Sequence, residues 1–305
     1  VGSEMCIRDR PLALAQAAAT ARNGNLSLAR YLDRLDCYRS ERVIRPIPGD
    51  YYTDDVATAL CMAIEDTLEN LEDGTKQAAR YILGALALLA ESGVPTRWLD
   101  PTIEQLDDRG LGNANQAADE DVHDALTELI HRSIVQQPGE GATTMVHRLQ
   151  AQAFRESWDA TEAENASESA AIVLGEVDVD SFPRNDTDSR RRETLDLIEQ
   201  LRAIGEQAYS HSLFEYDGVC SNLLKTMFAA NNLGMSLELM TLKNALEVLK
   251  ESIGPNHAVI LIARSILAQS YQRSGHIEKA ISMFEDLLET SRSVSYTHLT
   301  LPTIL

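Results

Sequence analysis

Histidine and cysteine are the side chains best suited to chemistry near neutral pH, and their spacing here indicates no catalytic or metal centre. His123 and His131 lie eight residues apart on one predicted helix, without the carboxylates or thiols that would complete a zinc site. The sequence has no GxxxxGK[ST] or GxGxxG phosphate loop, no HExxH and no GxSxG. Its four cysteines show no CxxC spacing: Cys6, Cys37, Cys61 and Cys220. We therefore predict no catalytic residue, no metal site, and reduced thiols instead of disulfides.

His147 is the histidine whose surroundings suggest a role. Apolar residues at helical spacing over 122–130 are followed by an extended run, a Pro-Gly-Glu-Gly turn and a second extended run that ends at His147. Proline fixes φ and glycine reaches positive φ, so the two runs can pair as a β-hairpin. A new helix is predicted from Leu149. His147 either faces a ligand at the end of this hairpin or is a hairpin residue hydrogen-bonded to a neighbouring carbonyl.

This helix, hairpin and helix resemble the back half of the winged-helix domain of STAND-type signalling ATPases, the NB-ARC class. In that family, a histidine at the end of the hairpin faces the β-phosphate of bound ADP. The resemblance implies that Val146-His147-Arg148 is the corresponding motif and that His147 contacts nucleotide in the parent protein. The family's usual Met-His-Asp agrees with this sequence only at the histidine, so no role is carried over to Arg148.

A second likeness to the same family lies near the start of the chain. Pro11-Leu12-Ala13-Leu14 resembles the family's Gly-Leu-Pro-Leu motif, beginning at its proline. The resemblance implies that Pro11 packs on the adenine of the nucleotide in the parent protein. The alternative is that Pro11 occupies the first turn of an ordinary core helix, where its missing N–H is not needed.

The C-terminal third is helical in pattern and resembles tetratricopeptide (TPR) repeats. In that family, small and large residues at fixed positions let two antiparallel helices pack closely. The residues that match this packing pattern are Leu267, Ala268, Tyr271, Gly275, Ala280 and Phe284. Ala245 lies 35 residues before Ala280, close to the TPR period of about 34. The alternative is a generic helical bundle.

Composition and charge restrict the functional classes. The chain has 305 residues, is 44% hydrophobic but only 5% aromatic, and carries a formal net charge of -20. The predicted helix before the hairpin carries Asp121, Asp124 and Glu128, so it lacks the cations that DNA recognition needs. The most apolar run, 81–90, is half the length of a membrane span of about 20 residues. We expect a cytoplasmic protein that binds neither nucleic acid nor membrane.

These patterns predict a mainly α fold with several parts. Residues 1–10 and 294–305 resemble translated sequencing-adapter peptide, so we expect both ends to be non-native and the rest to be an internal part of a longer product; ordinary flexible termini are the alternative. The expected parts are a helical ARC remnant with linker (11–50), a winged-helix domain with one β-hairpin (51–158), an acidic spacer (159–192) and TPR-like repeats (193–293).

The resemblance implies the regulatory and protein-interaction part of a nucleotide-dependent signalling switch, without the ATPase core. ADP or ATP would bind to the parent protein and no cofactor to this chain. A protein or peptide ligand is expected on the TPR face, and the active parent is expected to be oligomeric. Two alternatives remain open: a TPR scaffold or adaptor without nucleotide switching, and a winged-helix transcriptional regulator.

Overall fold

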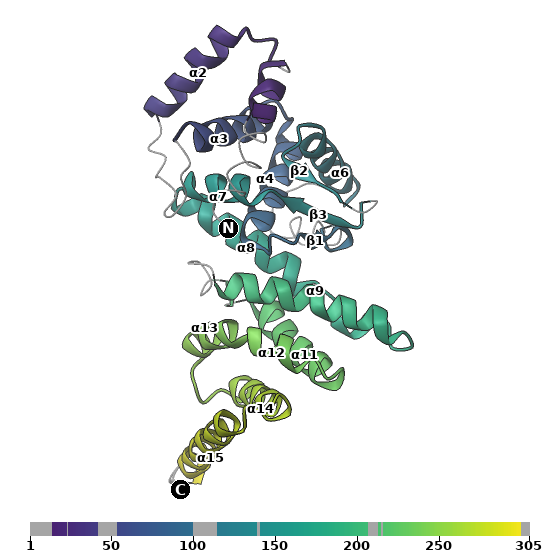
Figure 1. The fold of residues 1–305 in the computed structure, drawn as a ribbon, viewed down its shortest axis with the longest axis vertical. Coiled ribbons are helices and arrows are strands. Elements are labelled where there is room, and N and C mark those ends of the chain that lie inside the picture. The colour runs from purple at the N-terminus through teal and green to yellow at the C-terminus, as the bar shows by residue number, and fades with distance from the viewer. Residues whose placement is uncertain are drawn as a thin grey trace, which may run out of the picture. The chain divides into compact units, whose positions relative to one another are not determined.

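The computed structural model is mainly helical, which confirms the mainly α part of the predicted fold (Figure 1). It describes residues 14–22, 24–41, 54–99, 115–138, 141–206, 213–214 and 216–299. The chain divides into two compact units, Val1–Ala170 and Ala171–Leu305, which we call the first and the second unit. In the described part of the chain, no helix combines the length and apolar character needed to cross a membrane.

The first unit is built from helices around a small sheet. After the helical residues 14–22 come α2 (Leu28–Glu41), α3 (Asp54–Glu69), α4 (Asp73–Leu88), α6 (Asn115–His131), α7 (Arg148–Glu156) and α8 (Ala160–Gly175), whose last turn belongs to the second unit. The central helix is α4, which packs against α6 and α7. Most of its residues after Gln77 are buried, which is consistent with its long apolar run from Tyr81.

Helices α3 and α7 pack together through small and aliphatic side chains. Ala57, Leu60 and Cys61 of α3 form one buried cluster with Leu149 and Ala153 of α7. The Cys61 thiol donates a hydrogen bond to the Ala153 carbonyl over 3.2 Å. Small residues at these positions let the two helices approach closely, and α7 is thereby fixed directly after the sheet.

The sheet has three short strands, one more than the predicted hairpin. The hairpin is confirmed: β2 (Val135–Gln136) pairs antiparallel with β3 (Thr143–Val146), and Val135 lies opposite Val146. The additional strand, β1 (Val94–Pro95), pairs antiparallel with the other side of β3, so the strand order is β1-β3-β2. Hydrogen bonds between side chains reinforce this pairing, because the Thr96 and Thr144 hydroxyls are 2.9 Å apart.

The stretch expected to be an acidic spacer contains α8, and this helix has a buried side as well as an acidic one. Its buried residues are mostly small: Ala163, Ala166, Ser167, Ser169, Ala170, Ala171, Ile172, Val173 and Leu174. A capping box begins the helix, since Glu162 N–H donates to the Asp159 carboxylate and Asp159 N–H donates to Glu162. The alanines and serines, which look neutral in sequence, are the residues that let α8 pack closely.

The second unit is wholly helical in its described part. Its helices are α9 (Thr187–Gly205), α11 (Asp217–Asn232), α12 (Ser236–Thr241), α13 (Lys243–Ile253), α14 (Ala258–Arg273) and α15 (Ile277–Leu299), as Figure 1 shows. Asp186 caps α9 by accepting hydrogen bonds from the amides of Asp188 and Ser189. The expected non-native C-terminal stretch begins at Val294 and belongs to α15 as far as Leu299.

Buried polar and small residues fix the start of this unit. Asn222 of α11 is 3% exposed, and its Nδ2 lies 2.7, 3.1 and 2.9 Å from the carbonyls of Leu174, Gly175 and Val177. Leu174 and Gly175 end α8, where carbonyls have no partner within the helix, and Val177 follows it. At the end of α9, a Cβ on Gly205 would lie 2.6 Å from the Ala245 backbone nitrogen, so only glycine permits this helix crossing.

Candidate functional site

His147 lies between β3 and α7, in the part of the sheet predicted from the sequence. It follows Val146 directly and is the N-cap of α7, with φ -60° and ψ 134°. The Leu149 amide donates a hydrogen bond to His147 Nδ1 over 3.3 Å. A neutral imidazole that accepts at Nδ1 carries its proton on Nε2. The Nε2–H at the opposite edge of the ring is then a hydrogen-bond donor.

This geometry adds a contact to the structural one of the two sequence interpretations. A purely structural His147 was expected to be hydrogen-bonded to a neighbouring carbonyl, and the structure shows an amide donor at its Nδ1. The physical reason is its position, because the first amides of a helix lack partners within the helix and are satisfied by an N-cap side chain. The ring is half-buried.

A second histidine in the chain has the same local geometry. His257 is the N-cap of α14, with φ -66° and ψ 138°, and its Nδ1 accepts from the Val259 amide over 3.3 Å. His257 is exposed and follows the helix connection at Gly254. The cap alone therefore does not distinguish His147 as a ligand-binding residue, and His257 provides an internal control for it.

The polar network behind His147 holds β3 in place. The Thr96 hydroxyl donates to the Gly141 carbonyl over 2.6 Å, and Gln137 Nε2 donates to the Thr144 hydroxyl over 3.2 Å. Thr144 is fully buried. These bonds join the residues next to β1 and β2, the turn and β3, and His147 directly follows β3. Sequence periodicity gave no signal for this network.

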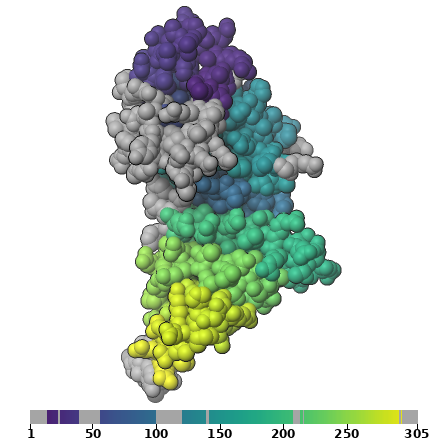
Figure 2. All heavy atoms as spheres, viewed as in Figure 1, coloured from purple at the N-terminus to yellow at the C-terminus, as the bar shows by residue number. Residues whose placement is uncertain are grey.

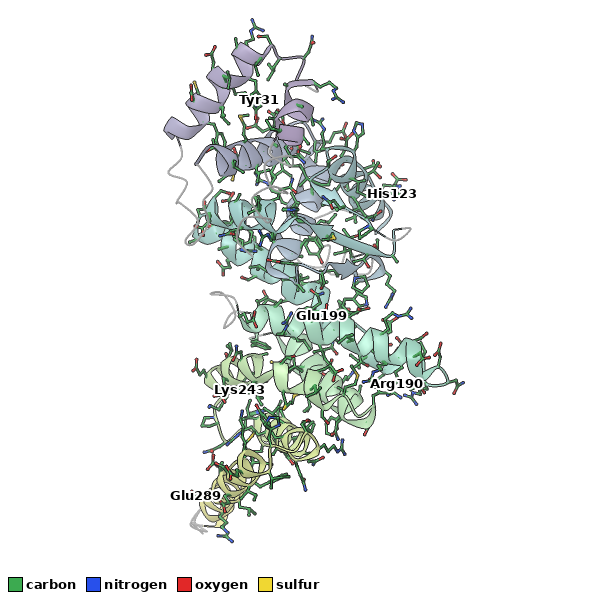
Figure 3. All side chains as sticks on the ribbon, viewed as in Figure 1. Tyr31, His123, Arg190, Glu199, Lys243 and Glu289 are labelled. Carbon is green, nitrogen blue, oxygen red and sulfur yellow. The ribbon has the colours of Figure 1, made fainter. Side chains whose placement is uncertain are left out.

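Pro11, the other predicted nucleotide contact, lies outside the described residues. The helix that follows it, over 14–22, is described and contacts the end of α6 through Gln16. The side chain of this buried glutamine donates from Nε2 to the Ser133 carbonyl over 2.6 Å. In α2, Tyr31 (labelled in Figure 3) is buried, and burial raises the pKa of its hydroxyl, with a smaller contribution from the Asp66 carboxylate.

The six predicted packing residues of the TPR-like region all belong to the α14–α15 helix pair. Leu267, Ala268 and Tyr271 are buried on α14, and Ala280 is buried on α15. Gly275 turns the chain between the helices with φ +84°, and Phe284 is half-buried. Lys279 of α15 donates to the Tyr271 hydroxyl over 2.7 Å, which ties the pair together. Much of the remaining α15 side-chain surface is exposed (yellow in Figure 2).

The helix pairs repeat after a longer interval than the one predicted. Gly275 follows Gly234 by 41 residues, and both have positive φ. The hydrogen bond from the Met235 amide to the Ala230 carbonyl recurs, 41 residues later, from His276 to Tyr271. The equivalent of Ala280 is thus Leu239, not Ala245. The sequence comparison missed this because α12 and α13 are separate helices, which lengthens the first pair.

The described residues offer little for catalysis. Within them, no group of three or more histidine, cysteine, aspartate or glutamate side chains could hold a metal ion. Burial raises the pKa of the Cys220 thiol to about 11, and the Asp217 carboxylate adds to the shift. This thiol is therefore protonated at neutral pH and is not a ready nucleophile.

Helix α6 carries acidic side chains along its length and basic side chains near its end, as the sequence indicated. Asp121 accepts a hydrogen bond from the Thr75 hydroxyl over 2.9 Å, and Glu128 lies 3.4 Å from Arg132 Nε. His131 Nδ1 is 3.7 Å from the same Glu128 carboxylate. The two basic side chains at the end of α6 thus lie beside a carboxylate, and the helix offers no row of cations for a phosphate backbone.

No protein-family model matches this sequence, and no curated protein matches it closely enough to count as a relative.

Proposed function

We propose that this chain is the regulatory and protein-interaction part of a nucleotide-dependent signalling switch of the NB-ARC–TPR type, without its ATPase core. In the parent protein, ADP would hold the first unit against that core. A protein or peptide ligand on the helix pairs of the second unit would favour release. The proposal includes a cytoplasmic location and an oligomeric active state.

The element order of the first unit supports a winged-helix domain. The helix α4 leads into β1, α6 leads into β2, and β3 lies between β1 and β2 in the sheet. This succession fits a three-stranded wing packed on helices. Since α6 is acidic, the proposal assigns the domain to contacts with protein and nucleotide, and a transcriptional regulator is the weaker alternative.

The observation that carries the proposal is the position of His147. The side chain directly follows the central strand β3, and Nδ1 is used as the α7 cap. In the proposed parent, the Nε2–H donates to an oxygen of the ADP β-phosphate. A hydrogen bond to a charged group contributes about 1.5–3 kcal/mol. Pro11 is the second residue proposed to contact the nucleotide, at its adenine.

The second unit supports the protein-interaction role. One turn geometry recurs between its helix pairs after 41 residues, and small residues lie at close crossings; TPR-type solenoids, which bind peptides along stacked helices, have such pairs. Both α11 and α14 leave a large apolar side chain exposed, Phe228 at 45% and Ile262 at 41%. Given the net charge of -20, we propose a ligand that contains basic residues, so its binding weakens as salt increases.

The alternative is a TPR scaffold or adaptor without nucleotide switching. One observation favours it: His257 has the same cap geometry as His147, although nothing suggests that His257 binds a nucleotide. Under this alternative, both histidines serve only as helix caps, and the helices of the first unit have only a structural role.

Purification of the protein at its natural length distinguishes the two functions. Heat denaturation followed by ion-exchange chromatography would identify any nucleotide that co-purifies. The switch predicts tightly retained ADP and a GxxxxGK[ST] phosphate loop upstream of residue 11. A full-length protein with neither, and with more helix pairs instead, would establish the scaffold.

A further inference from the structure

A groove in the first unit, separate from His147, has the size and lining of a ligand site. It encloses about 480 Å³ and is lined by residues of α3, α4, α7, α8 and the connection between α7 and α8. Pockets of 300–1,000 Å³ are typical for small ligands or an inserted side chain. The helices α4 and α8 approach closely beside it, since a Cβ on Gly84 would lie 3.0 Å from the Ala166 Cα. At this crossing α4 and α8 are in close contact, and the groove lies beside it.

Aromatic side chains supply the apolar part of the groove. Phe154 of α7 and Trp158, in the connection between α7 and α8, are half-buried and both line it. Their rings meet edge to face, with centroids 5.5 Å apart and an interplanar angle of 77°. Tyr81 and Leu68 contribute buried surface next to them. The face of a tryptophan ring attracts cations through its quadrupole.

The charges of the lining favour a cation. Five carboxylates line the groove, Glu65, Glu69, Asp73, Glu162 and Glu168, against the two cations Lys76 and Arg80. Burial strengthens this preference, because the half-buried charged residues are Glu65, Glu162, Glu168 and Lys76, whereas Arg80 is exposed. Half-buried charges act through a lower effective dielectric than exposed ones. The exposed Arg80 can line the groove with its stem while its guanidinium remains in water.

We propose that this groove binds a planar organic cation with an apolar stem, presented by an arginine side chain of a partner polypeptide. The guanidinium would lie over the aromatic pair and between the half-buried carboxylates. The stem would cover the apolar surface of Leu68 and Tyr81. This inference does not depend on nucleotide binding by the parent protein.

Three probes of similar size test the chemistry: benzamidine, benzamide and benzoate, which carry positive, zero and negative charge. Binding to the full chain is followed by the indole N–H signals in ¹⁵N NMR. The chain has two tryptophans, and Trp98→Phe assigns the signal of Trp158. We expect benzamidine to shift the Trp158 signal in a saturable and salt-sensitive way, benzamide to bind more weakly, and benzoate not to bind.

Two variants and a control localise the site. Trp158→Leu should weaken benzamidine binding about three- to tenfold, through loss of the cation–π contact and ring surface. Glu168→Gln keeps the side-chain shape and should weaken it about two- to fivefold. Glu289→Gln removes the same charge from α15 (labelled in Figure 3) and should leave binding unchanged. Circular dichroism confirms that each variant is folded.

A last pair of probes tests whether the bound cation is the side chain of an arginine residue. N-acetyl-arginine amide should bind more tightly than its neutral isostere, N-acetyl-citrulline amide. The proposal is wrong if benzoate or benzamide binds as well as benzamidine, if the Trp98 signal shifts in place of Trp158, or if Glu168→Gln behaves like Glu289→Gln. Equal binding of the arginine and citrulline compounds would also overturn it.

Discussion

The two units use similar glycine turns in different surroundings. Gly93 in the first unit and Gly275 in the second both have positive φ, +92° and +84°. A Cβ on Gly93 would lie 2.6 Å from Thr143 Cγ2 and 2.9 Å from the Thr144 carbonyl oxygen. A Cβ on Gly275 would meet no atom of the described chain within 4 Å. The first glycine is enclosed by the sheet, and the second lies in an open connection between consecutive helices.

The same difference holds for the contacts that stabilise each unit. In the first unit, a side-chain hydrogen bond joins residues as far as 117 positions apart, as for Gln16 with Ser133. In the second unit, Asn222 bonds residues 45 to 48 positions earlier, and one turn geometry recurs after 41 residues. Unique long-range contacts can hold a single defined site, whereas repeated helix pairs provide an extended surface. We propose a nucleotide contact for His147 and not for His257 because His147 follows the hairpin that resembles the NB-ARC wing, whereas His257 lies between two helices.

The largest expected effect comes from adding a methyl group at the two glycines. Gly93→Ala should lower the free energy of unfolding by about 2–4 kcal/mol, since backbone strain and overpacking both contribute. Gly275→Ala should lower it by about 1 kcal/mol through the strained φ alone. Urea denaturation followed by circular dichroism measures both values. Equal losses would mean that the sheet does not enclose Gly93.

A buried side chain in the second unit tests whether that unit also contains irreplaceable contacts. Asn222→Ala removes the donor for three carbonyls at and after the end of α8 and should destabilise the fold by about 1–3 kcal/mol. The exposed Asn256 provides the matched control, and Asn256→Ala should change stability by less than about 0.5 kcal/mol. If both variants melt alike, the start of the second unit is held by helix packing alone.

Helices and the hairpin could be predicted from the sequence because their patterns are local. The apolar period of α4, and the Pro-Gly-Glu-Gly turn between β2 and β3, are each contained in one short stretch. Strand β1 could not be predicted, since its two residues, Val94 and Pro95, carry no period and proline disfavours strands. Its identity as a strand depends on pairing with Thr143 and Thr144, about 50 residues later.

The candidate sites were predictable to different degrees. His147 was found from its place after the hairpin, but its role as a cap depends on where α7 begins, and helix boundaries are the least certain feature of a sequence prediction. The groove beside Trp158 was missed entirely, because its lining comes from four helices. The 41-residue interval was missed because the break between α12 and α13 has no glycine or proline to mark it.

The smallest expected effects concern the two histidine caps within this chain. His147→Ala and His257→Ala should each reduce stability by about 0.5–1 kcal/mol, because each leaves one amide at a helix N-terminus without its partner. Aspartate at either position should restore most of the loss, since it is a preferred N-cap. Thermal melting of the four variants measures this. A much larger effect of His147→Ala would indicate a packing role in the first unit beyond the cap.

Nucleotide retention by the natural-length protein is the most direct test of the proposed switch. His147→Ala and His257→Ala would be purified in parallel, and ADP affinity would be measured by competition with a fluorescent analogue. We predict that His147→Ala weakens ADP binding about tenfold to a hundredfold, the effect of losing a hydrogen bond to a phosphate. His257→Ala should bind ADP like the wild type. If both variants retain ADP equally, His147 is only the cap of α7, and the assignment of a nucleotide contact to the first unit is wrong.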